Sequence, residues 1–232
     1  MTASSDSSLQ QVLADYAAIP NGSNVFYTTA TKGENSGISG AVRLLQSNEP
    51  FAKVLETASP ESLTTLFTNE TALLKGLPHL YQLRGNAVVV VVDLAFQDYS
   101  VITALKDLDI VTLVSNTAAV AVKHAHLAQT TALERHIPVF HFVNFTAINK
   151  ADAIVPDFQD TVTPASQDED EEEKTLSIEE FLVENGAEAF TLESAGSSPS
   201  IAIVNLSQYS KQIASALSQE VSLIDLNVYR PW

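Results

Sequence analysis

The residues whose types and positions could support acid–base or metal chemistry are five histidines and, among many ill-placed carboxylates, Asp93 and Asp98. His124 and His126 lie two positions apart on an expected helix, about 200° around its axis, so they cannot share a ligand. His141 is expected at the edge of the core, and the sequence predicts that the histidines do not converge. Asp93 ends an expected strand at the edge where α/β sheets bind ligands, and Asp98 opens the next helix. These two aspartates could supply a general base, although turn formation and helix capping also explain them.

A glycine-rich segment, residues 33–40, follows an expected strand and could hold a phosphate. Its glycines have the wrong spacing for a dinucleotide-binding fingerprint, and no acidic residue ends the following strand to bind a ribose. A flexible connection is therefore expected, with a weak anion-binding loop as the alternative. Serine-hydrolase, zinc-peptidase and P-loop motifs are absent. The chain also has no cysteine, which excludes a thiol nucleophile, a thiolate zinc site and an iron–sulfur cluster held by this chain.

The elements that would position these residues follow an α/β pattern. Five consecutive valines within residues 87–94 predict a strand covered on both faces, as in a mainly parallel sheet flanked by helices. Alanines at positions 118, 121, 125, 128 and 132 form one helical stripe that can pack closely on such a sheet. The other expected strands are residues 25–31, 63–68, 110–115 and 138–145. The expected helices are residues 41–58, 69–83, 98–108 and 117–135.

The composition changes near Asn149, and residues 151–175 are predicted to be an acidic linker that contains the six acids Asp168–Glu173. A capping-box pattern at Ser177–Glu180 then predicts a helix that ends at Asn185. Strands at 201–206 and 221–228, with a helix at 208–217, predict the start of a second α/β domain. The expected organisation is an N-terminal segment (1–23), an α/β domain (24–150), the linker, and a truncated second domain (176–232) of what we expect to be a longer polypeptide.

The charge of the chain excludes several classes of partner. Twelve basic against twenty-eight acidic residues give 12 − 28 = −16, which opposes binding to nucleic acids and to anionic membranes. No run of 18 apolar residues occurs, and residues 1–6 lack the features of a signal peptide. A soluble, cytoplasmic protein is therefore expected. One hypothesis is an acidic binding module whose Asp168–Glu173 run recruits a basic partner.

Several segments, taken in order, resemble the first two domains of pyruvate:ferredoxin oxidoreductases. The resemblance spans about residues 24–232, with the acidic linker as an insertion, and implies a thiamine-diphosphate-binding-like α/β fold followed by the start of a transketolase C-terminal-like domain. The segments that carry it are Thr64–Leu74, Gln97–Lys106, Val111–Asn116, Ile137–Phe142 and Leu223–Pro231.

The chain resembles more closely the N-terminal part of fungal assimilatory sulfite reductase haemoprotein (β) subunits. This resemblance implies a parent enzyme that takes electrons from NADPH through a partner flavoprotein α subunit carrying FAD and FMN. It also implies siroheme and a [4Fe–4S] cluster, held by four cysteines in a C-terminal part, for reducing sulfite to sulfide. The segments that carry the resemblance are Met1–Ser4, Val25–Lys32, Asp93–Ser100, Ala104–Leu108, Pro138–Phe142 and Val228–Trp232.

The departures from the oxidoreductase pattern bear on thiamine chemistry. By this resemblance the substrate-binding arginine of that family falls on Lys106, which cannot make the two-pronged contact of a guanidinium. The glutamate that activates the thiamine ring falls near Ser47, with Glu49 two positions away, and Thr31 matches a substrate-contacting threonine. The metal–diphosphate motif is absent from this chain, and in the family it lies on a later domain.

The sequence therefore predicts a non-catalytic N-terminal assembly region of a hetero-oligomeric sulfite reductase, with no catalytic, cofactor-binding or metal-binding residue of its own. The alternatives are a thiamine-diphosphate-dependent 2-oxoacid oxidoreductase module, with Thr31, Glu49 and Lys106 at the substrate, and the acidic binding module described above.

Overall fold

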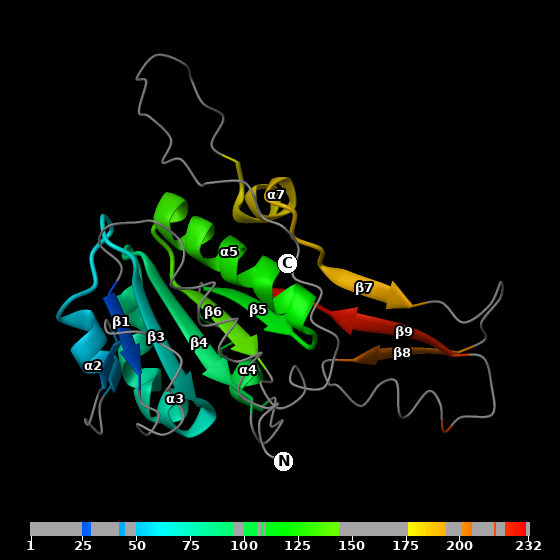
Figure 1. Cartoon of the computed structure of the whole chain (residues 1–232), viewed down its shortest axis with the longest axis horizontal. Helices are drawn as coiled ribbons and strands as arrows, with labels where there is room; N and C mark the ends of the chain where they lie inside the picture. The colour runs from blue at the N-terminus through cyan, green and yellow to red at the C-terminus, as the bar shows by residue number, and fades with distance from the viewer. Residues whose placement is uncertain are drawn as a thin grey trace, which may run out of the picture.

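The computed structural model of the chain describes a main α/β body from which a smaller sheet extends (Figure 1). The residues it describes are 25–28, 42–44, 50–94, 100–105, 108, 110–143, 176–193, 201–205, 216 and 221–230. The predicted N-terminal segment and acidic linker lie outside these residues, and the domain boundaries stay predictions.

The main sheet has seven strands in the order β10-β5-β6-β4-β3-β1-β2. Its neighbours pair in parallel, except that β10 is antiparallel to β5. This arrangement confirms the predicted mainly parallel α/β sheet. Its strands are β1 (Val25–Thr28), β2 (Val42–Leu44), β3 (Thr64–Asn69), β4 (Val88–Asp93), β5 (Val111–Ser115), β6 (Val139–Val143) and β10 (Val228–Arg230).

Strand β4 is covered on both faces, as its valine run predicts. All five valines are buried, with at most 1% of any side chain exposed. Because successive side chains of a strand point to opposite faces, Val89 and Val91 enter the hydrophobic cluster beneath helix α5. Val88, Val90 and Val92 enter a second cluster on the other face. Strand β4 therefore joins two cores that lie on opposite sides of the main sheet.

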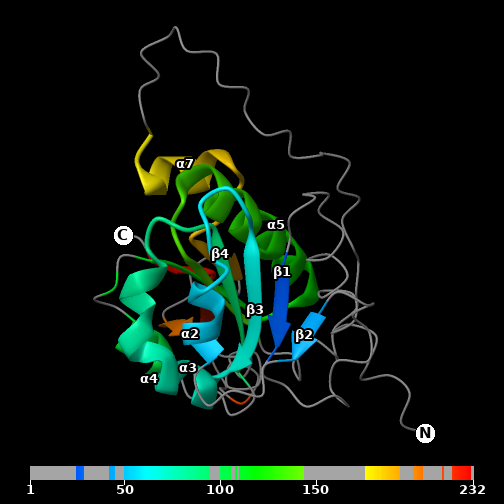
Figure 2. The same cartoon turned by 90° about the vertical axis from the view of Figure 1, so that its left-hand side faces the viewer.

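Helix α5 (Ala118–Arg135) covers one face of the main sheet, and shorter helices cover the other (Figure 2). The side chain of Thr117 accepts a hydrogen bond from the Val120 amide at the start of α5, and His136 ends it in a left-handed conformation, with φ of 52°. Four alanines of the predicted stripe, at 121, 125, 128 and 132, are buried against the sheet. The shorter helices are α2 (Pro50–Leu55), α3 (Glu70–Gly76), the 3₁₀ helix η1 (Leu77–Leu83) and α4 (Ser100–Ala104).

The helix predicted over residues 41–58 is wrong in its first part, because Val42–Leu44 forms strand β2. Pairing with β1, which the local sequence does not encode, outweighs the helical propensity of this segment. Only α2 remains helical, and it begins at Pro50, a residue suited to the first turn of a helix. The helix predicted over 69–83 does begin with the Asn69 cap, whose side chain accepts from the Ala72 amide, but it becomes a 3₁₀ helix at Leu77, where Pro78 follows.

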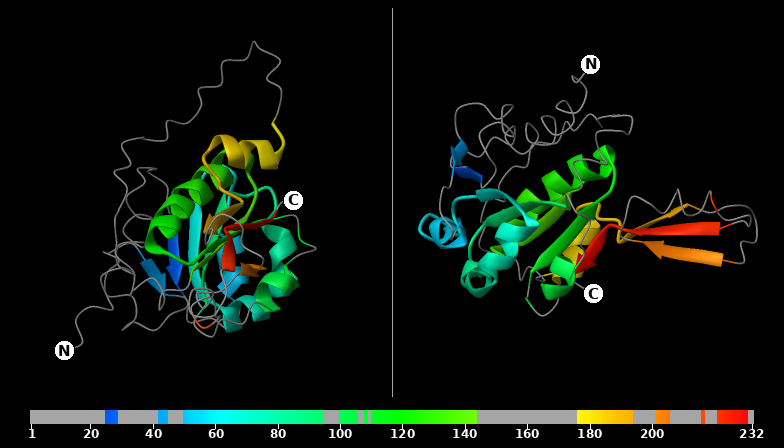
Figure 3. Two further views of the ribbon diagram at one scale, coloured as in Figure 1. Left: turned by 90° about the vertical axis from the view of Figure 1, so that its right-hand side faces the viewer. Right: turned by 90° about the horizontal axis from the view of Figure 1, so that it is seen from below.

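The C-terminal part contains helix α7 (Ile178–Glu184) and a three-stranded sheet. The capping box of Ser177 and Glu180 is present as predicted, and Leu182 packs into the cluster beneath α5. The small sheet has the order β7-β9-β8, and it projects away from the main body (Figure 3). Its strands are β7 (Phe190–Glu193), β8 (Ile201–Asn205) and β9 (Val221–Leu226).

The strand predicted over residues 221–228 is divided at Asn227. Strand β9 belongs to the small sheet, whereas β10 pairs with β5 in the main sheet. The backbone of Asn227 fixes this crossing, because its carbonyl accepts from the Val114 amide and its amide donates to the Ala189 carbonyl. Strand β7 is absent from the sequence-based expectation, and of the helix predicted at 208–217 only residue 216 lies within the described residues.

Candidate functional site

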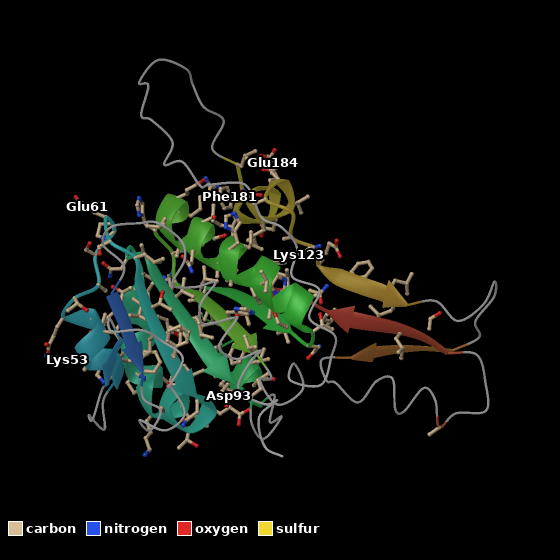
Figure 4. The ribbon with its side chains drawn as sticks, in the orientation of Figure 1. Lys53, Glu61, Asp93, Lys123, Phe181 and Glu184 are labelled. Carbon is tan, nitrogen blue, oxygen red and sulfur yellow. The ribbon has the colours of Figure 1, made fainter. Side chains whose placement is uncertain are left out.

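The substrate-facing residues that the thiamine hypothesis requires, Thr31, Glu49 and Lys106, lie outside the described residues. So do Asp98, the glycine-rich segment 33–40 and the acidic run, and their roles stay predictions. Asp93 is the last residue of β4, at the carboxyl edge of the main sheet as predicted, and it is partly buried (Figure 4). Its role as a general base stays a prediction.

Two histidines and a serine meet instead beneath helix α5. The hydroxyl oxygen of Ser115 lies 2.7 Å from Nε2 of His141 and 2.9 Å from Nδ1 of His124. The two imidazole rings are 5.7 Å apart, edge to face. The expectation that the histidines do not converge is therefore wrong, and so is the expectation of His141 at the edge of the core, since its side chain is fully buried.

Three neighbouring elements bring these residues together. Ser115 ends β5, and His141 lies in the middle of β6, opposite Leu113 of β5 and Val91 of β4. Leu113 and Val91 both belong to the cluster beneath α5, so His141 shares that face of the sheet. His124 reaches the same face from α5, three residues after Ala121 and one before Ala125, and only 4% of it is exposed.

Burial favours the neutral form of both imidazoles. Burial lowers the pKa of His124 to about 3, with the positive charge of Lys123 adding to the effect. Burial also holds the pKa of His141 well below its usual value, and the adjacent His124 lowers it further. The Ser115 hydroxyl has one proton, so it donates to one ring and accepts from the other. This His124–Ser115–His141 cluster is thus a hydrogen-bonded polar network inside an apolar core.

The cluster is not arranged for hydrolysis. A catalytic serine has to reach its substrate, whereas Ser115 is fully buried and its hydroxyl lies between two imidazoles. What the arrangement can do is fix the position of α5 on β5 and β6 and couple the tautomer of His124 to that of His141.

A cavity of about 200 Å³ opens beside His124, between α5, the end of α7 and the junction of β9 with β10. Its lining residues are Val120, Lys123, His124, His126, Leu127, Asn185, Gly186, Glu188 and Asn227. The side chains of Lys123 and Glu188 are 51% and 64% exposed, and Nζ of Lys123 lies 4.0 Å from Oε1 of Glu188. Among the lining groups, His124 is a deeply buried imidazole and Asn227 a buried amide.

Helix α7 is held against α5 by Arg135, whose guanidinium lies 4.9 Å from the ring centroid of Phe181. The same guanidinium donates a hydrogen bond to the Leu176 carbonyl. At the other end of α7, the side-chain amide of Asn185 donates to the Phe181 carbonyl over 2.9 Å. Gly186 follows with φ of 81°, a conformation that favours glycine. These contacts place Asn185, Gly186 and Glu188 opposite α5.

In the described part of the chain, no three side chains of the metal-binding types come together to hold an ion. Within the same residues, no helix combines the length and apolar character needed to cross a membrane.

The sequence does contain a signal for the His124–Ser115–His141 cluster, although the sequence analysis did not predict the cluster. Position 124 lies within the alanine stripe, since 121, 124, 125, 128 and 132 follow helical spacing. A histidine on a buried helical stripe, together with a histidine inside a strand that helices cover, needs a polar partner in the core. Which residue supplies it depends on strand order, and β6 inserts between β4 and β5.

Comparison with known proteins shows what this chain is similar to. No family model matches the chain. The chain is 37% identical over 243 aligned positions to the sulfite reductase [NADPH] subunit β of Saccharomyces cerevisiae, an alignment that covers the whole chain. The match lies in the N-terminal part of that relative, and the chain spans about 16% of its length. The sequence resemblance to sulfite reductase β subunits is thereby confirmed.

Among solved structures, the chain is similar to a 2-oxoglutarate:ferredoxin oxidoreductase from Magnetococcus marinus, which has 2-oxoglutarate, coenzyme A and succinyl-CoA bound. The TM-score is 0.58 at 10% sequence identity, over 99% of this chain and 54% of the other. This likeness confirms the predicted fold, and at such low identity it shows the fold alone.

Proposed function

We propose that this chain is the N-terminal region of a sulfite reductase (NADPH) β subunit and that it contributes to assembly of the enzyme, not to its chemistry. The identity of 37% along the entire chain is the observation that carries this proposal. The complete cytoplasmic enzyme then reduces sulfite to sulfide in sulfate assimilation, and so supplies cysteine and methionine biosynthesis.

The composition of the chain supports a role outside the redox chemistry. A [4Fe–4S] cluster is held by cysteine thiolates, and this chain has no cysteine. In this proposal, siroheme and the cluster bind in another part of the β polypeptide. NADPH, FAD and FMN bind to the partner flavoprotein α subunit, which completes a hetero-oligomer.

An apolar face on the small sheet supports a role in assembly. Phe190 and Leu192 are 55% and 57% exposed, although both are large hydrophobic residues. In the antiparallel pairing of β7 with β9 they lie opposite Leu226 and Ile224, so the four side chains share one face of the sheet. Contiguous apolar surface of this kind marks contacts with other protein surfaces.

The first test is to purify the native polypeptide with an antibody against residues 50–94, and to record its mass and visible absorption spectrum. A chain several times longer than 232 residues that carries siroheme bands is expected. A colourless chain of about 25 kDa would contradict the proposal and would favour a small acidic binding module.

The second test separates assembly from catalysis in the full-length enzyme. Thr31→Ala, Glu49→Gln and Lys106→Ala are each expected to leave sulfite-dependent NADPH oxidation unchanged. Loss of turnover in the Lys106→Ala enzyme, with the hetero-oligomer intact, would contradict a purely structural role and favour retained thiamine chemistry. Removal of Asp168–Glu173 is a matched test of the acidic run: loss of the α subunit from the complex would assign partner recruitment to that run.

A further inference from the structure

The cavity between α5 and α7 has the features of a built ligand site, and it is independent of the proposed assembly role. Its floor includes His124, a polar side chain that is 4% exposed and whose Nδ1 is fixed by Ser115. Its walls include the aliphatic side chains of Val120 and Leu127. Sites for drug-sized ligands have volumes of roughly 300–1,000 Å³, so a cavity of about 200 Å³ suits a smaller molecule.

The mouth of the cavity carries one positive and one negative charge. Nζ of Lys123 and Oε1 of Glu188 are 4.0 Å apart, beyond the hydrogen-bond range of about 2.7–3.2 Å. Each group therefore keeps hydrogen-bonding capacity for a third partner. A simple anion would be attracted by Lys123 but repelled by Glu188. A simple cation would be attracted by Glu188 but repelled by Lys123. A molecule that carries an ammonium group and a carboxylate on the same carbon can bind both groups at once.

The interior of the cavity can hydrogen-bond an uncharged polar group. Because Ser115 occupies Nδ1 of His124, Nε2 is the ring nitrogen left for a ligand. Burial lowers the pKa of His124, so this ring adds no charge. At the exposed rim of the cavity, the Asn185 amide nitrogen donates to the Phe181 carbonyl, which leaves the Asn185 side-chain oxygen as an acceptor.

From this arrangement we infer that the cavity binds a small free α-amino acid. Lys123 binds its carboxylate, Glu188 binds its ammonium group, and its side chain points inward past Val120 and Leu127 toward His124. A small amino acid with a hydroxyl or similar polar side chain fits best, because the imidazole of His124 can hydrogen-bond to it.

The test measures binding to the full-length protein by hydrogen–deuterium exchange, with L-serine as the probe. Serine is expected to protect peptides from residues 118–128 and 184–189. N-acetyl-L-serine, which lacks the ammonium group, and L-serinamide, which lacks the carboxylate, are expected to bind about ten- to hundredfold more weakly, the loss expected for one charge-assisted hydrogen bond. Sodium sulfate is expected to give no protection.

Each other outcome overturns the inference. Equal protection by serine and its two blocked analogues would show that the charges do not select a zwitterion. Protection by sulfate but not by serine would identify an anion site. No protection by about 10 mM serine would show that the cavity does not take this class of ligand.

Matched variants test whether serine binding depends on the charges of Lys123 and Glu188. Lys123→Met and Glu188→Gln are each expected to weaken serine binding about tenfold or more. Lys53→Met is the control, because Lys53 is also half exposed and paired with an acid, Glu56, but lies away from the cavity. The double variant Lys123→Glu, Glu188→Lys is expected to bind D-serine in preference to L-serine, because exchanging the two charged groups around an inward-pointing side chain inverts the configuration that the site selects. Unaltered binding in either single variant would refute the assignment.

Discussion

The main sheet and the small sheet are both built from apolar strands, but they differ in how completely they are covered. Every residue of β5 and β6 is buried, as are all five valines of β4. In the small sheet, Phe190 and Leu192 keep more than half of their surface exposed. The main sheet therefore supplies most of the buried apolar area that stabilises the described part of the chain, while the small sheet leaves apolar side chains exposed, which is the surface that the proposed assembly role would use.

A second contrast lies within the main sheet, between its two faces. The face covered by α2, α3 and α4 packs a cluster of apolar side chains that includes Phe51, Phe140 and Phe142. The face beneath α5 combines small alanines with the His124–Ser115–His141 cluster. We therefore expect substitutions that remove volume from the apolar face to lower the stability of the protein. On the α5 face, we expect stability to depend on pH and on the hydrogen bonds of the cluster.

The largest effect on stability is expected from Phe140→Ala. Phe140 is fully buried on the apolar face, so the variant loses its transfer free energy and leaves a cavity. Its free energy of unfolding should fall by about 3–5 kcal/mol, measured by urea denaturation. Tyr81→Ala is the control, since Tyr81 is 57% exposed, and it should change stability by less than about 0.5 kcal/mol. A Phe140 variant as stable as the parent would contradict the separation of core from surface.

The next effect is a loss of stability in acid that comes from the α5 face. The folded-state pKa values of His124 and His141 are depressed, so the unfolded chain binds protons that the folded chain does not. Their contribution is therefore complete above about pH 6.5, and it is lost as the pH falls below that value, down to about pH 3 for His124. In this range each histidine should lower the free energy of unfolding by about 1.4 kcal/mol per pH unit, and the two together by about 2.7 kcal/mol per pH unit.

This pH dependence is checked by urea denaturation between pH 7.5 and 5. The double variant His124→Gln, His141→Gln should show a flatter profile than the parent, whatever its stability at pH 7.5. Phe140→Ala, a destabilised variant that alters no titratable group, is the control and should keep the parent slope. Equal slopes in the parent and the double variant would show that these rings do not control acid stability.

A smaller effect is expected from Ser115→Ala, which removes the hydroxyl between the two rings and adds no bulk. Two buried imidazole nitrogens then lose their partner, at a cost of about 1–3 kcal/mol. Thr57→Ala removes a partly buried hydroxyl that bonds the Val54 carbonyl near the end of α2, and it should cost about 1 kcal/mol. Thermal denaturation of both variants measures the difference, and a Ser115 variant that is more stable than the Thr57 variant would contradict a structural role for the cluster.

The smallest effect on stability is expected in the small sheet. The double variant Phe190→Ser, Leu192→Ser should unfold within about 0.5 kcal/mol of the parent, because both side chains are already largely exposed. The same variant should lose part of its association with the remainder of the enzyme, measured as the yield of hetero-oligomer by size-exclusion chromatography. Leu74→Ser, on the exposed side of α3, is the matched control. Full assembly by the double variant would remove the apolar face from the proposed interface.

Local patterns in the sequence predict much of the main sheet. The valine run of β4, the alanine stripe of α5 and the Ser177 capping box each depend on neighbouring residues, and each forms as predicted. Residues 41–58 show where this reasoning fails. Val42–Leu44 is a strand because β1 lies beside it, and a helical pattern of residues carries no information about a neighbouring strand.

The candidate site was predicted less well than the fold. Asp93 reached the carboxyl edge of the sheet as predicted, because strand direction fixes that edge. The His124–Ser115–His141 cluster was missed, since its members are separated by up to 26 positions and come from three elements. The cavity beside it was missed for the same reason, because Asn227 and Glu188 reach α5 only through the path of the C-terminal strands.

The sequence by itself determined the composition of the core, the alternation of strands and helices, the acidic charge and the absence of thiolate chemistry. These features follow from residue type and from the periods of about 3.6 and 2 residues that helices and strands impose. Only the tertiary structure decided the strand order, the division of residues 221–230 between two sheets, and the meeting of Ser115 with two histidines. Those outcomes depend on which distant segments share a buried surface, and burial of apolar area is a property of the whole fold.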